Sequence, residues 1–122
     1  MALKEDHAAA DATSIAVVPE NAQAQGGVLA KAEGVLAGTS FANAVFQQAG
    51  GLKLDWEKQQ GDCLSPGDIV FRVAGSARAL LAGERTALNF LQQLSGVATL
   101  TAQAVAAAGS LAVLDTRKTI PG

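Results

Sequence analysis

Small or apolar positions alternate with polar ones in two stretches of the chain, residues 22–32 and 52–59. Alternation with a period of two is typical of strands, because successive side chains point to opposite faces of a sheet. In the second stretch, Leu54 and Trp56 alternate with charged residues, which predicts a half-buried strand. A Ser-Pro-Gly-Asp turn then leads into a further predicted strand over 69–75. These short strands predict a small sheet or a flattened barrel.

Helical spacing of apolar residues occurs in three further segments. Residues 41–48 predict a short helix that Ser40 caps and Gly50 ends. Residues 77–93 predict a second helix, and Ser95 is the predicted cap of a third. The apolar residues that share one face of the second helix are Ala77, Leu80, Leu81, Leu88 and Leu91.

The second predicted helix also carries charged and polar side chains. Glu84 falls within its apolar face, where an unpaired carboxylate is costly to desolvate, so we expect a structural partner for it. A polar edge of the same helix is formed by Arg78, Arg85, Asn89 and Gln92. Charged helix faces are most often simply solvated, so this edge alone does not indicate a site.

The last apolar run of the chain, residues 111–114, is continuous and follows a helix, which is typical of a parallel strand buried on both faces. Substrates of α/β proteins bind at the carboxyl ends of such strands. Here the run is followed by Arg117 and Lys118, with Thr116 and Thr119 on either side. Two cations beside two hydroxyls favour an anion site, because the fork of Arg matches a carboxylate or phosphate and Lys adds a compact charge.

Composition narrows the class of protein. The 122 residues are 49% hydrophobic and 16% charged, which favours one globular domain with a stub of a second. The net charge of −2 gives no broad basic field, so nucleic acid and membrane are not expected partners. Cys63 and His7 are single in the chain, which disfavours disulfides and a Cys/His metal cluster. No export signal or apolar span is evident, and a reducing cytoplasm fits best.

Two longer segments resemble a known family. GERTALNFLQQLSGVATLT at 83–101, followed by LDTRKTIPG at 114–122, closely resembles quinolinate phosphoribosyltransferase, the carboxylating nicotinate-nucleotide pyrophosphorylase. The resemblance extends over residues 11–122. It implies an α+β or α/β fold, with an N-terminal α/β sandwich domain over 1–109 and the first strand and loop of a truncated barrel over 110–122. We therefore expect an N-terminal portion of a longer enzyme, inactive by itself.

The resemblance also implies a reaction. In that family, a phosphoribosyl group passes from phosphoribosyl pyrophosphate (PRPP) to the ring nitrogen of quinolinate. Carbon dioxide and pyrophosphate are lost, and nicotinate mononucleotide is formed for NAD biosynthesis. Magnesium is the implied cofactor, with its ligands expected outside this sequence. The substrates carry several negative charges, which matches a cationic site.

Site residues follow from the motif position by position. Arg85 corresponds to an arginine that reaches the active site of a neighbouring subunit and binds a quinolinate carboxylate. Arg117 and Lys118 correspond to the catalytic pair on the barrel side, and Thr116 and Thr119 add hydroxyls to the substrate site. A site shared between subunits requires a homodimer or a larger assembly.

Three other interpretations stay open from the sequence. A relative of the same fold, associated with molybdenum uptake loci, shares part of the Glu-Arg-Thr-Ala-Leu-Asn pattern. A carrier module of the biotinyl or lipoyl kind also joins short strands by Gly-Asp turns, but its acceptor lysine lies at a hairpin tip, whereas Lys53 and Lys58 lie in or beside a strand. The chain could also serve only as a folded oligomerisation piece.

Overall fold

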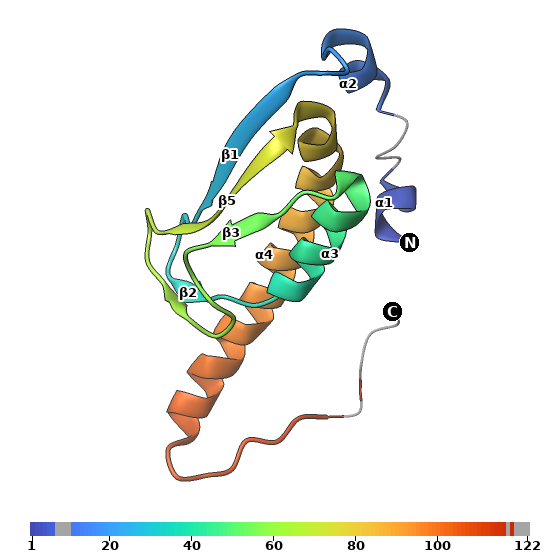
Figure 1. Ribbon diagram of the computed structural model, residues 1–122. Helices are drawn as coiled ribbons and strands as arrows, with labels where there is room; N and C mark the ends of the chain where they lie inside the picture. Colours follow the sequence, from blue (N-terminus) through green and yellow to red (C-terminus); the bar gives the residue numbers. More distant parts are fainter. Residues whose placement is uncertain (7–10, 117, 119–122) are drawn as a thin grey trace.

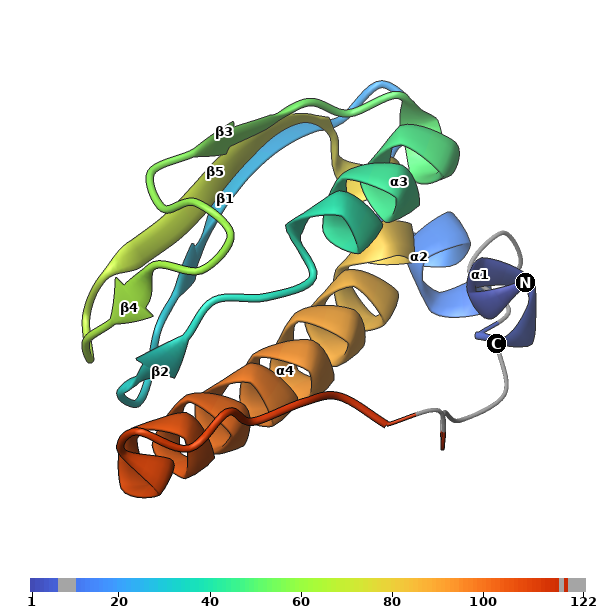
Figure 2. The same ribbon diagram turned by 90° about the horizontal axis from the view of Figure 1, so that it is seen from below.

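The computed structural model describes residues 1–6, 11–116 and 118. A curved antiparallel sheet covers two helices, α3 and the long α4, and α1 and α2 lie beside one end of α4 (Figures 1 and 2). The helices of the described residues are α1 (Ala2–Glu5), α2 (Ala12–Val17), α3 (Thr39–Gly50) and α4 (Ala77–Ala108). None of the described helices is long and apolar enough to cross a membrane.

The main sheet has three strands in the order β1-β5-β3, with bounds Gln23–Leu29, Ile69–Ser76 and Leu54–Trp56. The strands predicted over 22–32, 52–59 and 69–75 are confirmed, although the first two are shorter than predicted. Strand β3 ends at Trp56 because the amides of Glu57 and Lys58 both donate to the carbonyl of Val70, which breaks the regular ladder. A separate two-stranded sheet pairs β2 (Gly34–Val35) with β4 (Cys63–Leu64).

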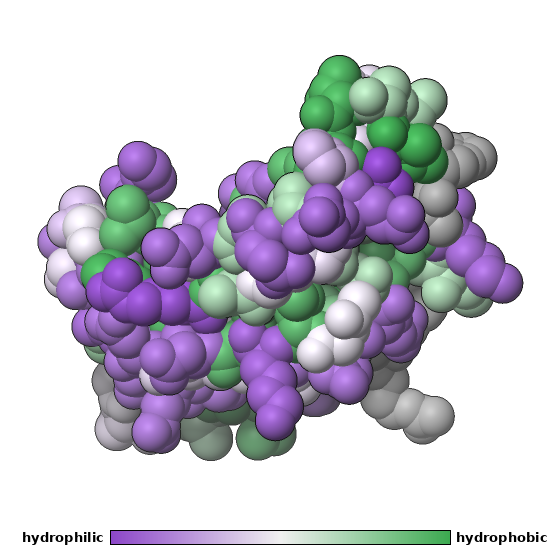
Figure 3. Space-filling model, turned by 45° about the horizontal axis from the view of Figure 1, so that its top comes forward, coloured by the Kyte–Doolittle hydropathy of each residue, from purple (hydrophilic) through white to green (hydrophobic). Residues whose placement is uncertain are grey.

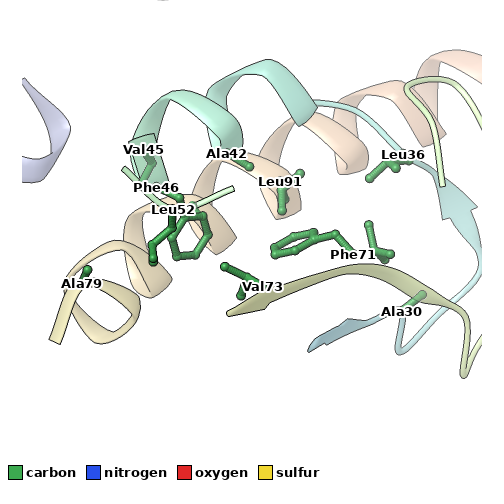
Figure 4. Close-up of a cluster of buried hydrophobic side chains, with 12 residues drawn as sticks. Ala30, Leu36, Ala42, Val45, Phe46, Leu52, Phe71, Val73, Ala79 and Leu91 are labelled. Atoms are coloured by element: carbon green, nitrogen blue, oxygen red, sulfur yellow. The ribbon is translucent and has the colours of Figure 1, made fainter. Parts of the chain in front are cut away.

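The core lies between the three-stranded sheet and helices α3 and α4, with Phe71 of β5 at its centre (Figure 4). Phe71 is fully buried; its ring centroid lies 4.7 Å from that of Trp56 and 6.2 Å from that of Phe46 on α3. Aromatic rings at these separations add to the energy of apolar burial. Through Phe71, the central strand β5 therefore packs against both the edge strand β3 and helix α3.

Both predicted ends of α3 are wrong by a residue or two. Gly38, with φ of 91°, is the N-cap instead of Ser40, and Gly51, with φ of 70°, is the left-handed C-cap instead of Gly50. The first amides of the helix are satisfied by a distant side chain, because Gln60 Oε1 accepts from the N–H groups of Gly38 and Thr39. Since a residue from another loop supplies the cap, local sequence could not identify it.

One continuous helix of 32 residues replaces the two helices predicted around Ser95. Ser95 does not cap a helix; its Oγ accepts from the N–H of Ala37 at 2.9 Å and donates to the Ala37 carbonyl. Thr99 Oγ1 likewise accepts from the N–H of Val35 at 2.9 Å. The two hydroxyls therefore hold the segment around β2 against the middle of α4.

The buried face of α4 also differs from the prediction. Glu84 is exposed, and Leu81 is 45% exposed, so the carboxylate does not need the expected buried partner. The buried positions are Ala77, Ala79, Gly83, Thr86, Ala87 and Leu91. Small residues dominate this face because α3 packs closely against it. Of the predicted large apolar residues, Leu91 is buried, whereas Leu80 and Leu88 are only partly buried.

After α4 the chain turns back toward the end of the molecule that carries α1 (Figure 1). Residues 111–114 are exposed coil, with Leu111 at 75% and Leu114 at 85%, so the predicted buried strand is absent from this structure. A parallel strand buried on both faces needs a strand on at least one side and layers above and below it. The described residues supply none of these to 111–114. The predicted domain boundary at 109/110 stays a prediction.

Candidate functional site

Arg85 projects from the first half of α4, and its side chain is 75% exposed. Its Nη1 donates to Oδ1 of Asp6 at 3.1 Å, forming an ion pair with the residue that ends α1. The neighbouring Thr86 is buried, and its Oγ1 lies 3.4 Å from Oδ2 of Asp6. Asp6 thus contacts two consecutive residues of α4 through its two carboxylate oxygens.

An open groove of about 400 Å³ runs along the same side of α4. Arg85, Asn89 and Gln92, which the sequence placed on a polar edge, all line it. Asp11 and Ser14 lie across from them at the start of α2. The remaining lining residues are Leu81, Glu84 and Leu88. Among the described residues, only Nη1 of Arg85 is hydrogen-bonded, and an arginine with such unused donors beside a groove of this size can bind a small carboxylic acid or phosphate.

The opposite wall of the groove is fixed by local hydrogen bonds. Asp11 caps α2, because its carboxylate accepts from the N–H groups of Thr13 and Ser14 and from the Ser14 hydroxyl, the last at 2.6 Å. The hydroxyl and backbone bonds to Ser14 lower the pKa of Asp11, and the nearby Arg85 charge adds a small lowering. The wall therefore stays negative at neutral pH.

Arg78 has a structural task at this end of the molecule. Its Nε donates to the carbonyl of Val18 at 2.8 Å, and its Nη2 donates to the carbonyl of Ile15 at 3.1 Å. These bonds satisfy carbonyls at the end of α2 and hold that helix on α4. Hydrophobic side chains gather over α2 (Figure 3), where Ile15 and Val17 are 52% and 71% exposed. Arg78 is thus the polar contact that anchors a helix with little apolar burial of its own.

The remaining predicted site residues lie in the segment after α4. Thr116 and Lys118 are exposed, and the N–H of Lys118 donates to Thr116 Oγ1 at 3.3 Å. Arg117 and Thr119 lie outside the described residues. In the part of the chain that the structure describes, no hydrogen bond joins Arg85 to Thr116 or Lys118. Among the described residues, the only hydrogen bond of the Arg85 side chain is therefore the one to Asp6, and the joining of the two halves of the predicted site stays a prediction.

Asp6 is the site residue that sequence reasoning missed. It lies 79 positions from Arg85, in a segment of mixed charge that carries no periodic pattern. No local signal could have paired the two residues, because the contact depends on how α1 docks against α4.

The antiparallel sheet layered on α3 and α4 defines an α/β sandwich domain, and an exposed arginine lies beside a groove on its helical side. The chain belongs to the family "Quinolinate phosphoribosyl transferase, N-terminal domain", whose model matches residues 11–95. This confirms the resemblance inferred from the sequence.

Curated relatives and a solved structure agree with this assignment. The chain is 39% identical over its whole length to the chloroplastic carboxylating nicotinate-nucleotide pyrophosphorylase of Oryza sativa, and covers 33% of that protein. It is 36% identical to the probable nicotinate-nucleotide pyrophosphorylase of Bacillus subtilis, covering 42% of it. The crystal structure of NadC from Streptococcus pyogenes superposes with a TM-score of 0.92 at 42% identity, with 98% of this chain and 44% of that one covered. The chain thus spans between a third and a half of these relatives.

Proposed function

We propose that this chain acts as the N-terminal part of an enzyme that transfers a phosphoribosyl group from PRPP to quinolinate. The products are nicotinate mononucleotide, pyrophosphate and carbon dioxide, and the cytoplasm is the proposed compartment. The observation that carries the proposal is the family match over 11–95, which includes Arg85, together with the exposure of that side chain beside a groove. Relatives named for this activity support it.

The proposed task of Arg85 is to bind one quinolinate carboxylate. A guanidinium offers several N–H donors in a planar fork and stays charged at every relevant pH, so it can donate two parallel hydrogen bonds to a carboxylate. Lys118 and Arg117 are the proposed cations of the second half of the site, with Thr116 and Thr119 beside them. Following the family resemblance, we propose that Arg85, whose side chain is 75% exposed, serves the site of another subunit in a homodimer or larger assembly.

Magnesium is not assigned to this chain. Within residues 1–6, 11–116 and 118, no group of three or more His, Cys, Asp or Glu side chains could hold a metal ion. The described residues therefore do not fit such a centre, and the proposed magnesium ligands lie outside them. The contribution proposed here is limited to the binding of substrate anions.

A chimera tests the proposal. Residues 1–122 replace the matching N-terminal part of Streptococcus pyogenes NadC, which the structural similarity makes compatible. We expect carbon dioxide release that requires both quinolinate and PRPP, and no release from residues 1–122 alone. A cooperatively folded chimera that leaves quinolinate unchanged, while unaltered NadC consumes it, would contradict the proposal. Activity on a different aromatic acid would favour the relative from molybdenum loci.

A further inference from the structure

The ion pair between Asp6 and Arg85 could either weaken or strengthen the binding of a substrate carboxylate to Arg85. A carboxylate on the substrate-binding arginine could block that arginine, or it could hold the guanidinium in place for the substrate. The geometry decides between these roles, because it shows which partner is fixed and which donors remain free.

Asp6 is the fixed partner of the pair. Its side chain is 24% exposed, against 75% for Arg85. Asp6 ends α1, where its N–H donates to the carbonyl of Ala2, and Leu3 of the same helix packs against the main hydrophobic core. The buried hydroxyl of Thr86 lies against its second oxygen. The position of the Asp6 carboxylate is therefore fixed by α1 and by Thr86 of α4, independently of the Arg85 guanidinium.

Arg85 keeps most of its hydrogen-bonding capacity. Only Nη1 is engaged, and among the described residues neither Nε nor Nη2 has a hydrogen-bond partner. The N–H of Nε and one N–H of Nη2 form an edge of the guanidinium that can donate two hydrogen bonds to one carboxylate. Asp6 and an incoming carboxylate can thus occupy different edges of one arginine at the same time.

We infer that Asp6 is a positioning residue that orders the Arg85 guanidinium for the substrate carboxylate, an inference that rests on the proposed function of Arg85. An unrestrained arginine has many rotamers, and ordering it on binding reduces affinity. The Asp6 contact orders the side chain beforehand. The opposing effect is repulsion of the substrate by Asp6 and by Asp11 and Glu84, which line the same groove. Solvent and salt screen this repulsion at the Arg85 guanidinium, whose side chain is 75% exposed, so we expect ordering to outweigh it.

Steady-state kinetics of the chimera test this inference. Asp6→Ala should raise KM for quinolinate by about three- to tenfold, the effect of freeing one long side chain, and leave kcat and the KM for PRPP nearly unchanged. Asp6→Asn keeps an oxygen acceptor and should give a smaller rise. Glu57→Ala is the matched control, because it removes the exposed ion pair, 2.7 Å long, between Glu57, which follows β3, and Arg72 of β5. An unchanged or lower KM in Asp6→Ala overturns the inference.

A double-mutant cycle separates positioning from general structural damage. If Asp6 acts through Arg85, Asp6→Ala should have no further effect on KM in an Arg85→Ala background. An equal effect in both backgrounds would show that Asp6 acts by another route and would overturn the inference.

A measurement without activity keeps the inference independent of catalysis. Nitrogen-15 relaxation of the Arg85 Nε–H in residues 1–122 should report greater mobility in Asp6→Ala, while the Nε–H of Arg72 should not change. Equal Arg85 mobility in both proteins overturns the inference. An inactive but folded chimera would instead overturn the proposed function, and the relaxation data would still decide whether Asp6 orders Arg85.

Discussion

Gly83 of α4 lies directly against the ring of Phe46 on α3: a Cβ on Gly83 would lie 2.9 Å from Cδ1 and 3.1 Å from Cε1 of that ring. Phe46 is buried and stacks edge-on against Phe71, so its ring has little room to move. The missing side chain of Gly83 is therefore what allows the two helices to pack this closely.

Gly83→Val is expected to destabilise the chain by about 1–3 kcal/mol, because the added methyl groups overpack the contact between α3 and α4. Chemical denaturation measures the free energy of unfolding. Gly96→Val is the control in the same helix, since a Cβ at Gly96 meets no atom within 4 Å. It should change stability by no more than about 0.5 kcal/mol. Equal losses in the two variants would disprove the close packing at Gly83.

Thr99→Val is expected to cost about 1–2 kcal/mol of stability, because it leaves the N–H of Val35 without its acceptor. The matched control is Thr101→Val in the same helix. Thr101 Oγ1, like that of Thr99, donates to the carbonyl four residues earlier, but Thr101 is exposed and receives no bond from β2. Thermal unfolding compares the two. A loss at Thr101 as large as that at Thr99 would show that the bond to Val35 adds nothing.

The ion pair between Lys58 and Asp68, 2.8 Å long, predicts a dependence of stability on pH. The hydrogen bond from Lys58 lowers the pKa of Asp68, and the same bond raises the pKa of Lys58. A carboxyl group with a lowered folded pKa stabilises the fold above its unfolded pKa of about 4, and this stabilisation is lost as pH falls through the folded pKa. A raised lysine pKa stabilises below its unfolded value of about 10.4, and that contribution is lost as pH rises through the folded pKa.

Asp68→Asn should therefore lower the melting temperature most between about pH 5 and pH 9, with a difference from the unaltered chain that narrows toward pH 2. Melting curves across this range provide the measurement. Asp55→Asn serves as the control, because Asp55 belongs to no ion pair in the described part of the chain. A difference at Asp68 that is constant with pH would contradict the electrostatic origin.

Subunit mixing tests whether sites are shared. Each of the chimeras Arg85→Ala and Lys118→Ala should lose most of its activity and remain folded. If Arg85 serves a neighbouring subunit, mixed dimers should regain up to about a quarter to a half of the unaltered activity, because one site then has both cations. Activity of verified heterodimers that stays at the level of the single variants would place both residues in the same subunit's site.

The sequence alone determined the three strands of the main sheet and the family. Alternating side chains predicted strands at 22–32 and 52–59, and the Pro-Gly turn predicted the start of a third strand at residue 69. The structure confirms a strand in each of these three places. The motif around Arg85 needed only residue identity to indicate the family, which the family match confirms, and the role of Arg85 stays a prediction. Such signals are local, because the periodicity of side chains and the preferences of turns depend on neighbouring residues.

Tertiary structure decided which side chains face which partner. The buried face of α4 contains the small residues Gly83 and Ala87, against which α3 packs, and Glu84 lies outside that face and is exposed. The spacing of the large apolar residues alone had predicted a buried face that includes Glu84. Ser95 bonds a residue 58 positions away instead of capping a helix, and Arg85 meets Asp6 across 79 positions. The run 111–114 is apolar enough for a buried strand but has no strand to pair with in the described chain. These outcomes depend on the size, shape and presence of distant partners, and a local pattern carries no information about them.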